Sequence, residues 1–459
     1  MPFVHEGLGN ASYLLDLGDG RAAVIDPQRD ARPYLQAAHR RGLRVTHAVE
    51  THVHADFVTG TRELAHHGAQ IVAAGAAGLA FPHQGLGDGQ RLDLGGLALE
   101  LLATPGHTPE HAAWLLREGE QPLGVFTGGA LIVGGVARTD LAGANRTEEL
   151  ARSAYRSLHQ RLLALPDALP VWPTHGPGSF CSAGGSGERT STIGEQKAAN
   201  PLLAGDPDEE EFVRRLVSGL GSYPDYFTWL PEYNRAGPQV LSRAWPHLPS
   251  LPLEQFLAQA MAEQVQLVDV RSTKAFAAGH VPDSIAIELR PQFASWLGWV
   301  IDPHRPVAFI TDGHTDRDEL INQCLGIGYE NVLGDLAGGF ARWQAAGLPV
   351  ARIAFAEAED LTARPVLDVR QRSEFGAAHV PGALNVELGS LESAELLGGV
   401  PTDSSAQRPL VTMCAHGQRS MTAASLLARA RGNTEGIAVF TGSAQGWAQR
   451  TGRRISSGT

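Results

Sequence analysis

Two segments in the second half of the chain repeat one another at a constant spacing. The matched residues, each pair 99 positions apart, are Asp269 and Asp368, Phe276 and Phe375, and His280 and His379. Each segment continues with a short apolar strand, a polar loop and a helix-like stretch. A repeat of about 100 residues that alternates strands with helices predicts tandem α/β domains with mainly parallel sheets. We assign these domains to residues 250–352 and 355–459.

The first half has a different pattern. Short β-like runs alternate with helix-like segments, and glycine loops separate them. An acidic helix start at Asp206–Glu211 predicts a closing helical arm. The proline-dense stretch between Pro238 and Pro252 is the best domain boundary. We therefore expect a first domain over residues 1–245.

Composition excludes several classes of protein. The 459 residues include 37 Lys+Arg and 49 Asp+Glu, a net charge of −12. This acidic balance argues against nucleic-acid binding, and three cysteines are too few for a disulfide scaffold. The N-terminus lacks a signal-peptide pattern, and no apolar run reaches the roughly 18 residues that span a bilayer. We expect a cytoplasmic protein without a membrane partner.

Histidines cluster in three loops of the first half. His52, His54 and Asp56 alternate directly after an apolar strand, His107 lies in a T-P-G-H-T sequence, and His175 lies in T-H-G. Imidazole and carboxylate groups that follow neighbouring strands are typical metal ligands. The pattern predicts a metal site where these loops converge.

These motifs resemble the metallo-β-lactamase fold of the glyoxalase II and persulfide dioxygenase branch. The resemblance implies an αββα sandwich and, for a persulfide dioxygenase, one ferrous iron held by His52, by His107 and by an aspartate in F-T-G-D. Here that segment has Gly129 in place of the aspartate, and Phe57 replaces the last histidine of the H-x-H-x-D-H motif. A dinuclear hydrolase site is therefore disfavoured.

The missing carboxylate leaves the ligand set open. Asp56 or Asp140 can supply it, and His54, His175 or water are further alternatives. Iron(II) is the metal that the resemblance implies, zinc is a second choice, and weak or absent metal binding is the remaining alternative. Arg138, in a segment resembling the family's G-R-T-D, is predicted to hold an anionic substrate, unless it is an ordinary surface arginine.

The last domain contains a loop with a cysteine. The apolar strand Leu410–Met413 runs into Cys414, and a helix-like stretch begins shortly afterwards. A thiol at a helix N-terminus faces backbone N–H groups that stabilise a thiolate or persulfide anion. We predict that Cys414 is catalytic and that Arg419 adds positive charge. The other residues of the sulfur-binding loop are Ala415, His416, Gly417, Gln418 and Ser420.

This C-x-x-G-x-R loop, together with the D-V-R element at Asp368, resembles a rhodanese domain. Aligning the same loop in the middle domain places Asp312 at the cysteine position, which predicts a rhodanese-like domain without a nucleophile. Cys324 is expected to be a core residue. Cys181 is either a sulfur relay near the histidines or a structural thiol.

The domain order resembles persulfide dioxygenase–sulfurtransferase fusions. That resemblance implies oxidation of a glutathione- or coenzyme A-like persulfide to sulfite with Fe(II) and O₂, and sulfane-sulfur transfer at Cys414 to a thiol or to sulfite. Thiosulfate is then a product or a sulfur donor. The alternatives are a sulfurtransferase with an inactive first domain, a glyoxalase II-like thioester hydrolase, and a non-enzymatic sulfur carrier. We expect no nucleotide cofactor, and a homo-oligomer is compatible with the sequence.

Overall fold

The computed structural model describes residues 1–184, 187–242, 244–260, 264–391 and 408–458. Its contacts divide the chain into two compact units. The first unit comprises Met1–Pro246 and Leu325–Gly328, and the second comprises His247–Cys324 and Tyr329–Thr459. Each unit is described by itself below.

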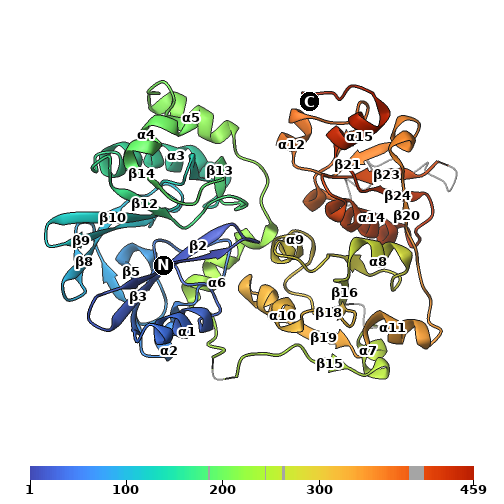
Figure 1. The fold of residues 1–459 in the computed structure, drawn as a ribbon, viewed down its shortest axis with the longest axis horizontal. Coiled ribbons are helices and arrows are strands. Elements are labelled where there is room, and N and C mark those ends of the chain that lie inside the picture. Colours follow the sequence, from blue (N-terminus) through green and yellow to red (C-terminus); the bar gives the residue numbers. More distant parts are fainter. Residues whose placement is uncertain (185–186, 243, 261–263, 392–407, 459) are drawn as a thin grey trace. The chain divides into compact units, whose positions relative to one another are not determined.

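Two six-stranded sheets form the first unit (Figure 1). The first sheet follows chain order, with β1 (Pro2–His5), β2 (Asn10–Asp16), β3 (Arg21–Ile25), β4 (Arg44–Val49), β5 (Gln70–Ala74) and β6 (Gln84–Leu86). The second sheet has the order β14 (Ser191–Thr192), β12 (Pro170–Pro173), β10 (Gln121–Gly128), β9 (Ala112–Glu118), β8 (Leu97–Ala103) and β7 (Arg91–Asp93). A separate pair joins β11 (Gly135–Ala137) to β13 (Ser182–Gly184).

Helices cover the outer face of each sheet. The helices of this unit are α1 (Arg32–Arg40), α2 (Thr61–His66), α3 (Thr147–Ser157), α4 (Ile193–Ala199), α5 (Glu209–Ser218) and α6 (Leu230–Ala236). Tyr34 of α1 and Leu64 of α2 pack against Val24 of the first sheet. Phe212 of α5 packs in a cluster with Val125 of the second sheet.

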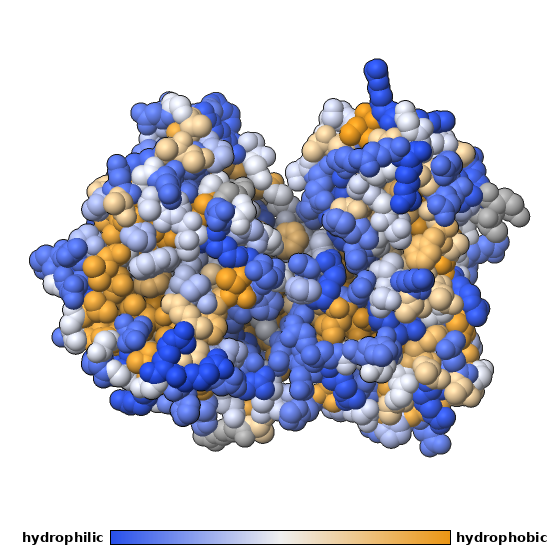
Figure 2. Space-filling model, viewed as in Figure 1, coloured by the Kyte–Doolittle hydropathy of each residue, from blue (hydrophilic) through white to orange (hydrophobic). Residues whose placement is uncertain are grey.

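A third hydrophobic cluster fills the space between the two sheets. Val49 and Val72 of the first sheet meet Trp114 and Phe126 of the second. Because each strand buries alternate side chains on opposite faces, this arrangement gives an αββα sandwich, as predicted. Figure 2 shows hydrophobic side chains reaching the surface near β3, β5 and β8, where partly buried residues such as Leu97 edge this core.

The second unit contains two parallel five-stranded sheets with the same order of strands. One has the order β15 (Ser250–Leu251), β19 (Val332–Leu336), β18 (Val307–Ile310), β16 (Gln266–Asp269) and β17 (Ile285–Ala286). The other has the order β20 (Ala354–Phe355), β24 (Ile437–Phe440), β23 (Leu410–Met413), β21 (Val366–Asp368) and β22 (Leu384–Asn385). Their helices are α7 (Leu253–Ala260), α8 (Thr273–Ala278), α9 (Phe293–Val300), α10 (Arg317–Gly326), α11 (Gly339–Ala345), α12 (Arg372–Ala377), α14 (Gln418–Arg431) and α15 (Ala444–Thr451).

The sequence repeat corresponds to a structural repeat. In the middle domain Arg271 donates to Asp269 and to the carbonyl of Gly279, and in the last domain Arg370 donates to Asp368 and to the carbonyl of Ala378. Phe276 stacks on His280 at 3.8 Å, and Phe375 stacks on His379 at 3.9 Å. The two parallel α/β domains predicted from the repeat are therefore present.

Strand register corrects one alignment made from the loops. Asp269 pairs with Ile310 in the middle domain, and Asp368 pairs with Met413 in the last domain. The residue that follows Ile310 is Thr311, so Thr311 and not Asp312 takes the place of Cys414. The loop before α10 is longer than the loop before α14, which explains the shift. The middle domain has no thiol at this position on either alignment.

Among the described residues, no helix combines the length and the apolar character needed to cross a membrane.

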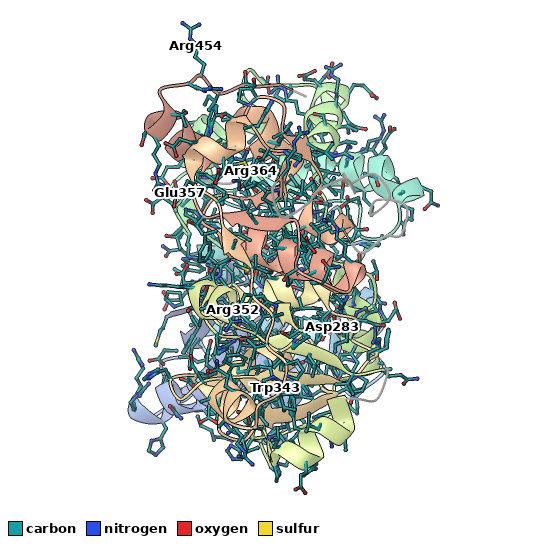
Figure 3. The ribbon with its side chains drawn as sticks, turned by 90° about the vertical axis from the view of Figure 1, so that its right-hand side faces the viewer. Asp283, Trp343, Arg352, Glu357, Arg364 and Arg454 are labelled. Carbon is teal, nitrogen blue, oxygen red and sulfur yellow. The ribbon has the colours of Figure 1, made fainter. Side chains whose placement is uncertain are left out.

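Substituting Arg370 by alanine tests the buried ion pair of the repeat. The Asp368 side chain is 0% exposed, so removal of its partner leaves an uncompensated buried charge and lowers stability by about 3–5 kcal/mol. Hydrogen exchange of the β21 and β23 amides measures this loss. The matched control is Arg364→Ala in the same domain (Figure 3), where a partly exposed pair with Asp360 is worth about 0.5 kcal/mol. Equal losses in the two variants would contradict the prediction.

Candidate metal site and cysteine loop

Three loops bring their histidines together at one end of the sandwich. His52 follows β4, His107 follows β8 and His175 follows β12, and all three side chains are buried. Their ring centroids lie 4.8 Å apart for His52 and His107, and 5.2 Å apart for each of the other two pairs. The residues predicted from three separate motifs therefore form one cluster.

Hydrogen bonds orient two of these imidazoles. The Thr51 hydroxyl donates to Asp26, so it accepts from Nδ1 of His52 at 2.8 Å and leaves Nε2 of His52 with a lone pair. Nδ1 of His107 donates to the carbonyl of Arg138 at 2.7 Å, and Nε2 of His107 is buried and has no hydrogen-bond partner in the described part of the chain. Burial lowers the pKa of His107 to about 3, which keeps this imidazole in the neutral state that binds metals.

His175 is the third imidazole of the cluster. Its Nδ1 lies 3.2 Å from the side-chain oxygen of Asn10 and 3.2 Å from Asp56, so this nitrogen is the donor. Nε2 of His175 lies 3.2 Å from Nε2 of His52. Two nitrogen lone pairs that face one another at this distance need a proton or a metal cation between them.

Asp56 supplies negative charge beside these rings. Its side chain is 2% exposed, and among the described residues its carboxylate has an ion-pair contact with Nδ1 of His175 at 3.2 Å but no hydrogen bond of good geometry. Burial raises the pKa of Asp56, but the neighbouring His175 outweighs it and holds the pKa well below the usual range.. A buried carboxylate without hydrogen bonds is costly unless a cation balances it. The buried ligand atoms of Asp56 and His107 thus fit a metal ion.

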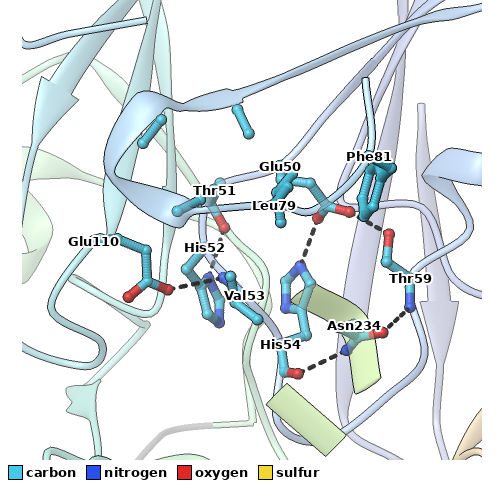
Figure 4. A pocket seen from close by; sticks show the side chains of 13 residues that line it. Glu50, Thr51, His52, Val53, His54, Thr59, Leu79, Phe81, Glu110 and Asn234 are labelled. Carbon is cyan, nitrogen blue, oxygen red and sulfur yellow. Dashed lines mark hydrogen bonds and ion pairs between the residues drawn. The ribbon is translucent and has the colours of Figure 1, made fainter. Parts of the chain in front are cut away.

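The two ring nitrogens of His54 have different surroundings (Figure 4). Its Nε2 lies 3.0 Å from Glu50 and 3.3 Å from Asp26, whereas its Nδ1 is buried and has no partner among the described residues. Burial opposes protonation, but Asp26 and Glu50 outweigh it and raise the pKa of His54 to about 10. The ligating atoms of His52, His54 and His175 lie within 4.8 Å of one another. A metal that binds Nδ1 must displace its proton, so His54 is a candidate ligand through Nδ1 only in its neutral form.

Two of the usual metal ligands of the resembling motifs are replaced, one of them the aspartate that would hold the single iron. Phe57 is fully buried and its ring stacks on His54 with centroids 4.1 Å apart, so an apolar ring stands where the motif has histidine. At Gly129 a Cβ atom would lie 2.7 Å from Cδ2 of His107 and 2.8 Å from Cβ of Ala137. The position that is aspartate in the resembling motif is filled by neighbouring side chains.

Asp140 and Arg138 bind each other and not the histidines. The guanidinium of Arg138 donates to both oxygens of Asp140 at 2.7 Å, and also to the carbonyls of Phe180 and Gly221. It also stacks over the ring of Tyr223 at 4.4 Å. These contacts use most of the N–H groups of the Arg138 guanidinium. The role of Arg138 in substrate binding stays a prediction. Asp140 does not join the described metal-binding groups.

A cavity of about 470 Å³ leads to the histidine cluster. His107 lies in its wall, beside Thr108 and Glu110 of the same loop and Arg235 of α6. This volume is within the range of sites for small molecules. The cavity gives a ligand access to His107, the ring whose Nε2 has no hydrogen-bond partner among the described residues.

Three nearby residues were not predicted as site residues. Asp26 directly follows β3, has φ of 50° and accepts hydrogen bonds from Thr51 and Thr174, which belong to two of the histidine loops. Glu50 faces His54, and Nε2 of His111 accepts from the N–H of Gly129 at 2.9 Å. The sequence feature that could have identified these residues was their position at strand ends, next to the histidine motifs.

In the last domain the predicted loop surrounds Cys414. The N–H of Gly417 donates to the sulfur at 3.1 Å, and the thiol lies 3.6 Å from the Ser420 hydroxyl. Gly417 has φ of 98°, a conformation that glycine adopts readily, and it turns the chain into α14. The guanidinium of Arg419 forms two hydrogen bonds to Glu374 at 2.6 and 2.8 Å and interacts electrostatically with Cys414.

A cavity of about 410 Å³ lies beside this loop within the second unit. His416 and Gln418 line it from the cysteine loop, and Thr273, Lys274 and Glu288 line it from the middle domain. The ring of Trp296 lies 5.4 Å from the Arg419 guanidinium. The middle domain therefore supplies one wall of the cavity beside the Cys414 loop.

Gly129→Ala tests the close packing at the histidine cluster. The added Cβ meets the His107 ring, so we expect a loss of about 1–3 kcal/mol in stability of the first domain and a weaker metal affinity. Urea denaturation and metal titration measure the two effects. At Gly87 the nearest atom to an added Cβ is 3.6 Å away, so Gly87→Ala is the control. A Gly129→Ala protein that matched Gly87→Ala would refute this packing.

Comparison with known proteins agrees with this geometry. The metallo-beta-lactamase superfamily matches residues 5–175, and the rhodanese-like domain matches residues 253–346 and 354–450. The human mitochondrial persulfide dioxygenase ETHE1 is 34% identical over 207 residues, which cover 44% of this chain and 74% of that protein. A hydroxyacylglutathione hydrolase of Methylococcus capsulatus is 35% identical, covering 47% of this chain and 89% of that protein.

A crystal structure of a metallo-beta-lactamase from Staphylococcus aureus subsp. aureus COL is similar over most of the chain. It has a TM-score of 0.65 and 29% sequence identity, and the match covers 73% of this chain and 98% of that one. The predicted fold and domain order are confirmed. The chain belongs to the metallo-beta-lactamase superfamily, with a first domain that matches persulfide dioxygenases and two rhodanese-like domains behind it.

Proposed function

We propose that this protein is an enzyme of sulfur metabolism that oxidises a small persulfide in its first domain and transfers sulfane sulfur at Cys414. The observation that supports the first activity most strongly is the donor set of His52, His107 and His175 beside the buried carboxylate of Asp56. The similarity to persulfide dioxygenase ETHE1 and the rhodanese-like domains favour sulfur chemistry over other uses of such a site.

The residues of the first domain suit one metal ion. His52 and His107 would hold it, with His175 and Asp56 as further ligands and His54 as an alternative. Iron(II) at this site would supply reactivity toward O₂ and open positions for a substrate sulfur, and zinc remains the second choice. Arg138 orients His107 through its backbone carbonyl, which presents Nε2 to the site.

The substrate is proposed to enter by the cavity at His107. Thr108, Glu110 and Arg235 line it, so it offers hydrogen-bonding and charged groups to a polar thiol such as glutathione or coenzyme A. Burial of the histidine cluster keeps bulk water away from the reacting sulfur. A glutathione- or coenzyme A-type persulfide is therefore the substrate class that we propose.

Cys414 is proposed to carry sulfane sulfur. Its thiolate attacks the outer sulfur of a persulfide, a new S–S bond forms, and the donor leaves as a thiolate. Sulfite then attacks the outer sulfur of the Cys414 persulfide, which releases thiosulfate and restores the Cys414 thiolate. The N–H of Gly417, at 3.1 Å from the sulfur, stabilises the anion in both steps.

The other functions have weaker support. A thioester hydrolase of the glyoxalase II kind needs two metals, but Phe57 and the crowded Gly129 remove usual ligands of the second. A sulfurtransferase with an inactive first domain does not account for the buried ligand atoms of His107 and Asp56. A non-enzymatic sulfur carrier would hold a stable Cys414 persulfide without multiple turnover.

Removal of the metal tests the first activity. We expect an iron-loaded preparation to consume O₂ with glutathione persulfide, and a chelator or His107→Ala to reduce the rate at least about 100-fold, since Nε2 of His107 is a ligand. An oxygen electrode measures the rate. His39→Ala, which changes an exposed histidine of α1, is the control. If the iron-loaded protein takes up no O₂, the dioxygenase proposal fails.

Cys414→Ser tests the second activity. Serine cannot hold a sulfane sulfur, so formation of thiocyanate from thiosulfate and cyanide should fall to background, whereas chelation should leave it unchanged. Cys324→Ala is the matched control, because Cys324 is a fully buried core thiol. Full activity in Cys414→Ser, or equal loss in both variants, would rule out Cys414 as the sulfur carrier.

A further inference from the structure

A buried thiol lies at the histidine cluster. Cys181 is 0% exposed and precedes β13, in the segment that follows His175. Its sulfur and the ligating nitrogens of His107 and His175 all lie within 4.8 Å of one another. The mechanism proposed above does not use this thiol.

Arg138 positions both Cys181 and His107. The backbone N–H of Arg138 donates to the carbonyl of Cys181 at 2.8 Å, and the carbonyl of Arg138 accepts from Nδ1 of His107 at 2.7 Å. Its guanidinium also donates to the carbonyl of Phe180 at 3.0 Å. Arg138, which directly follows β11, therefore fixes the segment of Cys181 relative to the His107 ring.

The segment around Cys181 has further supports. The N–H of Cys181 donates to the Ser179 hydroxyl at 3.2 Å, and Ser182 pairs with Ala137 in the β11–β13 ladder. These bonds fix the backbone of Cys181, and its thiol interacts with the side chains of Asp56 and Ser179. The backbone is held in place on both sides of Cys181, so its thiol stays next to two imidazoles. This is the position expected of a direct metal ligand.

An independent observation points to a ligand at the same place. Nε2 of His107 is buried and has no hydrogen-bond partner among the described residues, and the buried carboxylate of Asp56 has a 3.2 Å contact with His175 there, without good hydrogen-bond geometry. At the same time Gly129 offers no side-chain donor where the resembling motif has aspartate, and an added Cβ there would meet the ring of His107. The site therefore needs a cation and lacks its usual anionic ligand.

We propose that Cys181 is a metal ligand, so that the site is a mixed thiolate–imidazole centre of His107, His175 and Cys181, completed by His52 and Asp56. On binding, a metal–sulfur bond forms, the S–H bond breaks, and the proton leaves to the buffer; no electrons are transferred. A thiolate favours zinc or iron over manganese, calcium or magnesium. This inference rests on the proposed metal binding of the first domain and not on the reaction catalysed there.

Cobalt(II) titration of the full-length, metal-free protein tests the inference. We expect a thiolate-to-cobalt charge-transfer band in the near ultraviolet together with the visible d–d bands. Cys181→Ser should lose the charge-transfer band, keep the d–d bands and bind cobalt at least about tenfold more weakly. Cys324→Ala and Cys414→Ser are the controls and should keep both sets of bands.

X-ray absorption of the cobalt-loaded wild type gives a readout that needs no variant. We expect one sulfur neighbour at about 2.3 Å among nitrogen and oxygen neighbours. Bound cobalt with d–d bands but without the charge-transfer band or a sulfur neighbour would overturn ligation by Cys181 and leave the metal site standing. No cobalt binding by the wild type would overturn both this inference and the proposed metal-dependent activity.

Discussion

The first domain depends on the burial of metal-binding side chains that the described residues satisfy only in part. The αββα layers place three strand ends at one edge, and the loops that follow bury His52, His107, His175 and Asp56 together. A buried carboxylate and unpaired imidazole nitrogens cost free energy in such surroundings. A cation at the centre converts this cost into binding energy. Asp26 accepts the hydroxyl proton of Thr51, which in turn accepts from His52, and the carbonyl of Arg138 accepts from His107, so both rings keep a lone pair aimed at the cation.

In the second unit, both domains share the contacts that maintain the fold, but they differ in the residues available for sulfur chemistry. Both domains keep the same buried aspartate–arginine pair and the same stacked phenylalanine and histidine, because these contacts fix the loop between the first strand and its helix. At the next strand end they differ. Cys414 receives an N–H from Gly417, whereas Thr311 donates its hydroxyl to Asp335. The middle domain keeps the fold, lacks the thiol and lines the cavity beside the Cys414 loop.

Much of this organisation could be predicted. The repeat at a constant spacing predicted two similar α/β domains, and the loop around Cys414 could be found because its residues are contiguous in the chain. The histidine motifs also identified most members of the cluster. The alignment of the middle loop was wrong at Asp312, because loop length changed between the two domains and only strand pairing reveals the equivalent residue.

The sequence by itself determined the fold class, the domain order and the residue types available for metal and sulfur chemistry, since periodicity and short motifs are local properties of the chain. Only the tertiary structure decided which donors meet. It separated Asp140, held by Arg138, from Asp56, and it brought Cys181 next to His107 and His175. It also filled the space at Gly129 with the His107 ring. These outcomes depend on packing between segments far apart in the chain, which no local pattern records.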